Sequence, residues 1–215
     1  MEKSELHYET ITSLLKSVLL QLMREPLFNP FRLVGGTNLS LRYGYRQSID
    51  IDLFTDAEYG SLDFKVFEDY LKSHFLYYSC NDRGDIVGFG RSYYVGNELD
   101  DYIKIDLMYT DPFIREFDVY DNIRMASVDD IVAMKMNVIS RGGRKKDFWD
   151  IHYLLNHYSL ENMVSLHEER YEWEHDMPSL IQYFTNFSNA DNMPDPECFL
   201  NKNWDDIKLD LIDVA

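Results

Sequence analysis

Residues Gly35–Phe54, GGTNLSLRYGYRQSIDIDLF, carry the pattern that decides the fold. The stretch follows the apolar run Phe31–Val34 and opens with two glycines, which predicts a strand running into a tight turn. It closes with Ile49–Phe54, where apolar and acidic residues alternate as in a strand with one buried face. Because strand residues two apart face the same side, Asp50 and Asp52 share the face opposite the apolar one.

The segments around this stretch predict an α+β fold. Apolar residues at helical or strand spacing indicate the following elements: helices over 7–24, 37–43, 62–75, 128–140 and 147–156, and strands over 85–95 and 102–109. We expect a small mixed sheet with flanking helices in residues 1–125, forming an α/β core with an N-terminal helix, and a helical region in residues 126–215. Residues 188–197 are rich in Asn, Asp and Pro and predict an exposed loop.

Composition narrows the class of protein. The chain has 215 residues with 21 Lys and Arg against 38 Asp and Glu, a formal net charge of −17. This charge argues against a protein that holds extended duplex nucleic acid electrostatically, because phosphates must be met by Lys and Arg. The sequence lacks both an apolar run long enough for a membrane span and a signal-like N-terminus, so we expect a cytoplasmic protein with no membrane association. Two cysteines are too few for a disulfide framework, and the 16 tyrosines fit either an aromatic recognition surface or a core with its rim.

The paired carboxylates indicate a metal site. Asp50 and Asp52 repel each other on a sheet face and become favourable together when a divalent cation lies between them. The later strand Tyr102–Tyr109 repeats the logic, with Lys104 and Asp106 on one face. If the two strands are neighbours, Asp106 becomes a third oxygen ligand for Mg²⁺, an arrangement suited to phosphoryl or nucleotidyl transfer. The simpler interpretation is a sheet with one solvated acidic face.

Groups for binding phosphate lie within 20 residues of these carboxylates. The turn at Gly35 and Gly36 and the helix start at Thr37 supply backbone N–H groups that can hold a phosphate. Ser48 can add its hydroxyl, and Arg46 can meet phosphate oxygens, as can Arg42. An ordinary turn serine and solvated surface arginines explain these last residues equally well.

The C-terminal region adds a lysine in an unusual position. Lys135 lies in the middle of an apolar helix stripe formed by Ile131, Val132, Val138 and Ile139. Such a lysine either extends its amino group to solvent or is held by a partner, and it can then face nucleotide phosphates.

A basic segment follows that helix. Residues 141–150, RGGRKKDFWD, contain the densest basic cluster in the chain, including Arg141 and Lys146, followed by Asp147 and Asp150. The functional interpretation is that the basic residues bind nucleotide or acceptor phosphates while Asp147 orients the lysine or another catalytic group. The simpler alternative is a solvated loop followed by carboxylates that favour a helix N-terminus.

Three motifs together resemble the AbiEii/AbiGii-type nucleotidyltransferase toxins, which belong to the polymerase-β-like superfamily. The motifs are the run Gly35–Phe54, the sequence KIDLM at Lys104–Met108, and the spacing K-x5-R-x4-KD-x2-D from Lys135 to Asp150. The resemblance covers roughly residues 30–155. Where that family often has His or a similar residue after the glycine that corresponds to Gly44, this chain has Tyr45, which we expect to be structural.

The resemblance implies a reaction and a set of site residues. It implies Mg²⁺ held by Asp50 and Asp52, with Asp106 as a weaker third match, and transfer of a nucleotide from an NTP to an acceptor. The implied catalytic set is completed by Lys135 and Asp147, and the implied nucleotide-binding set is Gly35, Gly36, Thr37, Ser48, Arg46, Arg141 and Lys146. It also implies an acceptor such as tRNA or another RNA and a separately encoded antitoxin. Two alternatives stay open: an inactive protein of the same fold that binds a nucleotide or a partner, and an enzyme that nucleotidylates a small molecule.

Overall fold

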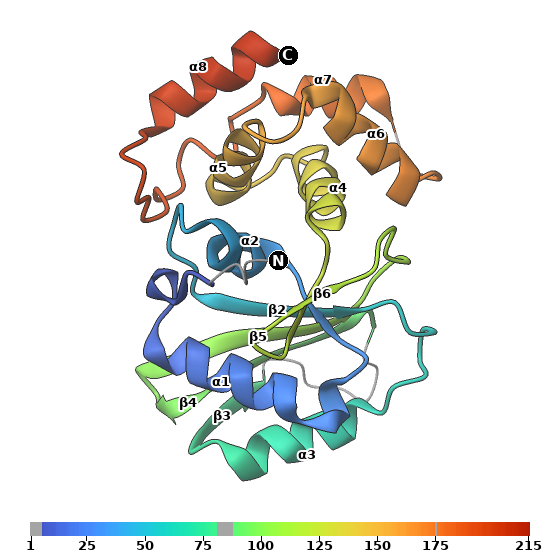
Figure 1. Ribbon diagram of the computed structural model, residues 1–215, viewed down its shortest axis with the longest axis vertical. Coiled ribbons are helices and arrows are strands. Elements are labelled where there is room, and N and C mark those ends of the chain that lie inside the picture. Colours follow the sequence, from blue (N-terminus) through green and yellow to red (C-terminus); the bar gives the residue numbers. More distant parts are fainter. Residues whose placement is uncertain (1–5, 81–87, 175) are drawn as a thin grey trace. The chain divides into compact units, whose positions relative to one another are not determined.

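The computed structural model describes residues 6–80, 88–174 and 176–215 (Figure 1). These residues group into two compact units by their contacts. Unit 1 comprises Met1–Arg42, Ser48–Pro112 and Phe117–Ala126, and unit 2 comprises Tyr43–Gln47, Phe113–Glu116 and Ser127–Ala215. The division into folding domains at 125/126 stays a prediction, and the contacts add that two short segments from before residue 126 belong with the later helices.

Unit 1 is built on a mixed sheet, whose described strands have the order β3-β4-β5-β2-β1-β7-β6. The strands are β1 (Arg32–Leu33), β2 (Asp50–Thr55), β3 (Tyr77–Cys80), β4 (Gly90–Glu98), β5 (Asp101–Tyr109), β6 (Asp118–Tyr120) and β7 (Ile123–Met125). The two strands that carry the predicted carboxylates, β2 and β5, are parallel neighbours. The condition under which Asp106 can join the pair is therefore met, and Asp52 stands directly opposite Asp106 in the register.

Helices of unit 1 lie on both sides of β2: Figure 1 shows α1 (Ser13–Arg24) and α3 (Phe64–His74) below it and α2 (Gly35–Tyr43) above it. The helix α1 begins after Thr12, whose side chain accepts a hydrogen bond from the Leu15 N–H. Its apolar stripe packs into one core with the inward-facing strand residues Ile51 and Leu53, both fully buried. Two short 3₁₀ turns, at Tyr8–Thr10 and Pro26–Phe28, flank α1.

Unit 2 is helical in its long C-terminal part. Its helices are α4 (Val128–Ile139), α5 (Lys145–Leu154), α6 (Leu160–Arg170), α7 (Met177–Phe184) and α8 (Trp204–Val214). Ser127 caps α4 by accepting the Asp130 N–H, as its sequence position predicts. The buried Asp130 is paired with the buried Arg170 at 2.6 Å, which ties α4 to α6. None of the described helices is long and apolar enough to span a membrane.

The α+β class is confirmed, and several local expectations need correction. Ile49 is 60% exposed because β2 begins one residue later, at Asp50. Val138 is 38% exposed, since it lies at the edge of the α4 stripe. The strands β3, β6 and β7 have only three or four residues, too few for a clear alternating pattern. Part of the expected strand 85–95 lies outside the described residues, and β4 extends further along the chain, to Glu98.

Candidate active site

The predicted site residues fall into one group in each unit, and each group has its own chemistry. The carboxylate group of unit 1 consists of Asp50, Asp52 and Asp106. The charge network of unit 2 consists of Lys135, Asp147, Asp150, Arg46 and Arg144.

In the carboxylate group, Asp52 reaches the start of α2. A Cβ added to Gly35, the first residue of that helix, would stand 2.2 Å from the Asp52 Oδ2 atom. Gly35 also has a positive φ of 69°, which side-chain-bearing residues rarely adopt. The glycine therefore permits a close approach between a carboxylate and the N-terminal turn of α2, where backbone N–H groups have no partner within the helix.

Two of the predicted nucleotide-binding residues, Thr37 and Ser48, are hydrogen-bonded to each other through their hydroxyls. Thr37 Oγ1 and Ser48 Oγ lie 2.8 Å apart, and both side chains are buried. The Thr37 hydroxyl also donates to the backbone carbonyl of Asp50. Through these two bonds Thr37 connects the first turn of α2 to the start of β2, from which Asp50 projects.

Asp106 is held from both sides. Its Oδ1 accepts a hydrogen bond from the Ser92 hydroxyl of β4 at 2.6 Å, and its Oδ2 pairs with Lys104 Nζ at 2.6 Å. Burial alone lowers the pKa of Lys104, but the bond to Asp106 and the nearby carboxylates outweigh it, so the pKa is raised. Sequence reasoning missed Ser92; the β4–β5 register, in which Ser92 faces Asp106, is the signal that finds it.

The donors of unit 1 fit a magnesium ion that binds with its substrate. Among residues 6–80, 88–174 and 176–215, no three His, Cys, Asp or Glu side chains gather closely enough to hold a metal alone. Magnesium, however, usually takes one or two carboxylates and completes its coordination with waters and substrate phosphates. Asp50 and Asp52, half-buried on one sheet face, supply that smaller set of hard oxygen ligands.

In unit 2, Lys135 is buried on the apolar side of α4, with 6% of its surface exposed, and it is paired. Its Nζ lies 2.6 Å from Asp147 Oδ1 and 2.7 Å from Asp150 Oδ2, both on α5. Of the two alternatives that the sequence left open for this lysine, the structure shows the one in which partners hold it in a buried position.

Further buried groups complete the network around Asp150. Arg46 grips both carboxylate oxygens of Asp150, at 2.6 and 2.8 Å. The Tyr45 hydroxyl donates to Asp150 Oδ1 at 2.5 Å, in line with the expected structural role of Tyr45. Because the Arg46 side chain is buried and engaged here, its guanidinium acts within unit 2 as the partner of Asp150.

Burial and pairing compete in setting these charges. Burial raises the pKa of Asp147 and of Asp150, but attraction to Lys135, Arg144 and Arg46 outweighs it, and both pKa values lie below the usual range. Burial lowers the pKa of Lys135, and the two carboxylates more than compensate, so it is raised. All three side chains therefore stay charged at neutral pH.

One arginine of the charge network, in the basic segment before α5, is exposed to solvent. Asp147 Oδ2 accepts from the Arg144 backbone N–H at 3.2 Å and from its Nε at 2.9 Å, while 54% of the Arg144 side chain is exposed. Arg141 is exposed and paired with Glu174, and Lys146 is half-buried at the start of α5. Arg144 is thus the basic residue that Asp147 positions, a role that its i,i+3 spacing to Asp147 indicates.

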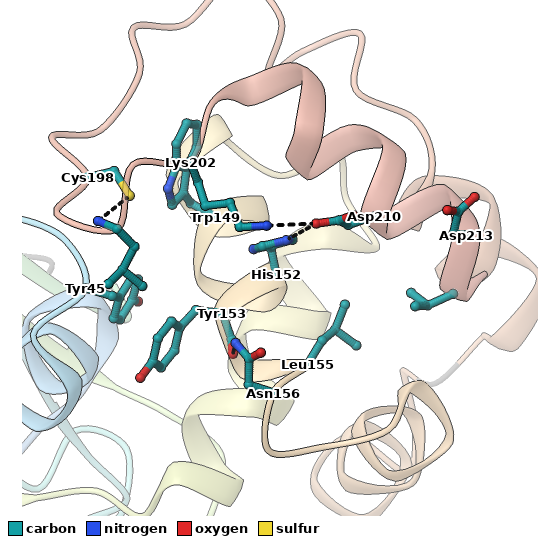
Figure 2. A pocket seen from close by; sticks show the side chains of 12 residues that line it. Tyr45, Trp149, His152, Tyr153, Leu155, Asn156, Cys198, Lys202, Asp210 and Asp213 are labelled. Atoms are coloured by element: carbon teal, nitrogen blue, oxygen red, sulfur yellow. Dashed lines mark hydrogen bonds and ion pairs between the residues drawn. The ribbon is translucent and has the colours of Figure 1, made fainter.

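A pocket of about 340 Å³ lies within unit 2 (Figure 2). The aromatic side chains of Tyr45, Trp149 and Tyr153 line it, and His152 and Lys202 both bond Asp210 there, at 2.7 and 3.2 Å. None of the predicted catalytic or nucleotide-binding residues lines this pocket.

The chain is similar in sequence to a known protein family and to a protein of Aquifex aeolicus. A family model described as nucleotidyl transferase AbiEii toxin, type IV TA system, matches residues 17–214. An uncharacterised Aquifex aeolicus protein, aq_aa25, is 29% identical over 148 residues, which is 66% of this chain and 67% of that protein.

Two solved structures share the fold. MenT4, the nucleotidyltransferase toxin Rv2826c of Mycobacterium tuberculosis, superposes with a TM-score of 0.57 at 12% identity, covering 92% of this chain and 79% of its own. JHP933 from Helicobacter pylori gives a TM-score of 0.53 at 18% identity, with coverages of 91% and 86%. At these identities the likeness is one of fold.

Proposed function

We propose that this chain, which belongs to the AbiEii family of nucleotidyltransferase toxins of type IV toxin–antitoxin systems, uses Mg²⁺ to move a nucleotide from an NTP to a hydroxyl of RNA, with tRNA as the first candidate. Family membership makes the chain a nucleotidyltransferase with a nucleotide substrate and a cognate antitoxin. The magnesium requirement and the RNA acceptor are the additions that the following observations support.

The observation that carries the proposal is the approach of Asp52 to Gly35. It joins a carboxylate pair to the N-terminal turn of α2, so that metal ligands and phosphate-binding N–H groups belong to one local structure. Asp50 and Asp52 would hold the Mg²⁺, which would supply positive charge that offsets the charge of the NTP phosphates. Gly36 and Thr37 offer backbone N–H groups to phosphate oxygens, and Ser48 fixes the hydroxyl of Thr37.

Asp106 and Lys104 have a supporting place in this proposal. The two residues face the Asp50–Asp52 pair across the β2–β5 register, with Lys104 opposite Asp50. Asp106 thereby keeps a cation beside the carboxylate pair and remains a candidate third ligand, if Mg²⁺ replaces Lys104 at its Oδ2 atom.

The unit 2 network contributes positioning. Lys135 neutralises Asp147 and Asp150, and Asp147 in turn directs Arg144, whose exposed guanidinium suits a phosphate. Arg141 and Lys146 extend the same basic segment. We therefore assign Lys135 and Asp147 an essential role that acts through charge balance and the orientation of Arg144.

The test is Asp50→Ala in a labelled-nucleotide assay with Mg²⁺, each of the four NTPs and total RNA. Loss of a metal-binding charge is expected to lower transfer by at least about 10²–10³-fold while the melting temperature is unchanged. The matched control is Asp69→Ala, which removes an exposed carboxylate from α3 of the same unit and is expected to keep full activity. Unchanged transfer by Asp50→Ala would refute the proposed site, and NTP binding by the wild type with no transfer to RNA would favour the inactive binding protein.

A further inference from the structure

Three tyrosines of unit 1 form an aromatic surface across three adjacent strands, and we call Tyr77, Tyr94 and Tyr102 the tyrosine platform. They come from β3, β4 and β5, whose adjacency is visible in Figure 1. The ring of Tyr102 lies 5.6 Å from that of Tyr77 and 5.6 Å from that of Tyr94, measured between ring centroids. Tyr102 is 46% exposed and the other two are half-buried, so the platform is open to a ligand.

The backbone register explains how the rings meet. Gly96 of β4 stands between Tyr77 of β3 and Tyr102 of β5, as the direct partner of both. Since Gly96 has no side chain, the two rings approach each other over its backbone.

The platform shares a sheet face with the carboxylate pair. Tyr94 is the register partner of Lys104, and Lys104 is the partner of Asp50, so these three residues form one row across β4, β5 and β2. Direct partners in a sheet project to the same side. Because neighbouring strands are about 4.8 Å apart, the backbone at Tyr94 lies on the order of 10 Å from that at Asp50.

This arrangement suits a particular acceptor. Bases that are not paired stack on aromatic side chains, and sheet faces with exposed aromatics are a common way to bind single-stranded RNA. Stacking does not depend on a basic surface, which a chain of net charge −17 lacks overall. Lys104, in the row between the rings and Asp50, supplies a local cation for the backbone phosphate that joins a stacked base to the reacting end.

We propose that the tyrosine platform binds the unpaired bases at the end of the RNA acceptor and thereby sets a preference for acceptors with a single-stranded end. This inference rests on the proposed nucleotidyltransferase function, because it assigns the platform to the acceptor of that reaction. It predicts that a blunt duplex is a poor ligand, since stacked and paired bases cannot lie on the rings.

The experiment measures RNA binding separately from transfer. The probes are a fluorescent RNA hairpin with about four unpaired 3′ nucleotides and the same hairpin with a blunt end, titrated with the full chain in Mg²⁺ by fluorescence anisotropy. The variants are Tyr102→Ala, Tyr102→Phe, which keeps the ring, and Tyr59→Ala, which removes another exposed tyrosine of unit 1. Melting temperatures and calorimetric titration with Mg²⁺ and NTP accompany each variant.

The expected result is a loss of affinity of about 10-fold or more for the single-stranded end in Tyr102→Ala. Tyr102→Phe and Tyr59→Ala are expected to bind like the wild type, and NTP affinity is expected to be unchanged in all variants.

Three outcomes would overturn the inference. Equal binding of the overhanging and blunt probes by the wild type removes the preference for unpaired bases. A lower melting temperature in Tyr102→Ala with unchanged RNA binding shows that the rings only cover Gly96. An equal loss of NTP affinity shows that they hold the base of the nucleotide instead.

The two proposals can fail separately. Asp50→Ala should bind the overhanging probe like the wild type, because this aspartate acts in the transfer step and the rings act in RNA binding. A wild-type chain that binds the probe through Tyr102 but transfers no nucleotide would contradict the proposed function and leave the RNA-binding surface intact.

Discussion

Each unit contains two aspartates that are close together in the chain, and the two pairs differ in how deeply they are buried. Asp147 and Asp150 of unit 2 are completely buried, and each is paired with at least one buried cation, Lys135 or Arg46. Asp50 and Asp52 of unit 1 are half-buried on a sheet face, where Asp52 lies against the glycine at the start of α2.

The difference in burial indicates that one pair of aspartates stabilises the fold and that the other pair is available to bind a metal ion. A buried carboxylate must keep its cation, because removing either partner leaves an uncompensated charge in a medium of low polarity. A half-exposed carboxylate keeps part of its hydration and can exchange water for a metal ion at lower cost. We therefore expect changes in the unit 2 network to act mainly on folding and changes in the unit 1 carboxylate group mainly on transfer.

The largest expected effect comes from Asp150→Ala, which removes the carboxylate shared by Arg46 and Lys135. The free energy of unfolding is expected to fall by about 3–5 kcal/mol, as for other broken buried ion pairs. All three tryptophans, Trp149, Trp173 and Trp204, belong to unit 2, so their fluorescence in a urea titration reports on this unit. Asp205→Ala, at an exposed aspartate of α8, is the control, and a loss below about 1 kcal/mol in Asp150→Ala would contradict the assignment.

Low pH also weakens this network, because it protonates the two carboxylates. Because the pKa values of Asp147 and Asp150 are below their ordinary value of 3.8 in the folded chain, their contribution to stability is complete above that value and is lost as the pH falls below it. Tryptophan fluorescence should therefore show little change in stability from pH 7 to pH 5 and a steep loss below about pH 4. Asp150→Ala should show a shallower loss than the wild type, and identical slopes would disagree with the network.

Features of these two regions that depend on residues close together in the sequence were predictable, and features that depend on distant residues were not. The strand Asp50–Thr55 and the helix Val128–Ile139 were predictable because their apolar spacing is local, and so was the sharing of one face by Asp50 and Asp52. The position of Lys135 in an apolar stripe was also predictable, but the sequence left open whether its amino group reaches solvent or has a partner.

Other features depend on contacts between distant parts of the chain. The pairing of Arg46 with Asp150 joins residues 104 positions apart, and no local pattern reports it. The approach of Asp52 to Gly35 depends on how β2 and α2 pack, although the glycine pair itself marked the place. The bond of Asp106 to Ser92 required the β4–β5 register, which hydrophobic spacing alone did not supply, whereas Lys104 shares a face of the same strand with Asp106.

A smaller effect on folding, with a larger one on transfer, is expected for Gly35→Ala. The substitution places a methyl group against Asp52 and forces a positive φ on a residue with a side chain, at a cost of about 1–3 kcal/mol. Displacing Asp52 should also reduce labelled-nucleotide transfer by about 10²-fold.

The matched control for this variant is Gly60→Ala. Gly60 has a similar φ of 81°, but a Cβ there would meet nothing within 4 Å. It carries the backbone strain without the collision, so the difference between the two variants measures the contact with Asp52. Equal transfer by both variants would remove the special role of Gly35.

Unit 2 is assembled from segments that are far apart in the chain and are therefore made at different times during synthesis. Tyr45 and Arg46, which hold the buried Asp150, are made about a hundred residues before it, and Ile114 offers its backbone N–H to the buried Asp130 from outside the helical region. A fragment of residues 127–215 keeps Lys135 and Arg170 as partners of these aspartates but loses the bonds from Tyr45, Arg46 and Ile114. Segments 43–47 and 113–116 are therefore made before the residues of α4 and α5 that they bond, and a fragment meant to keep these contacts has to include both segments.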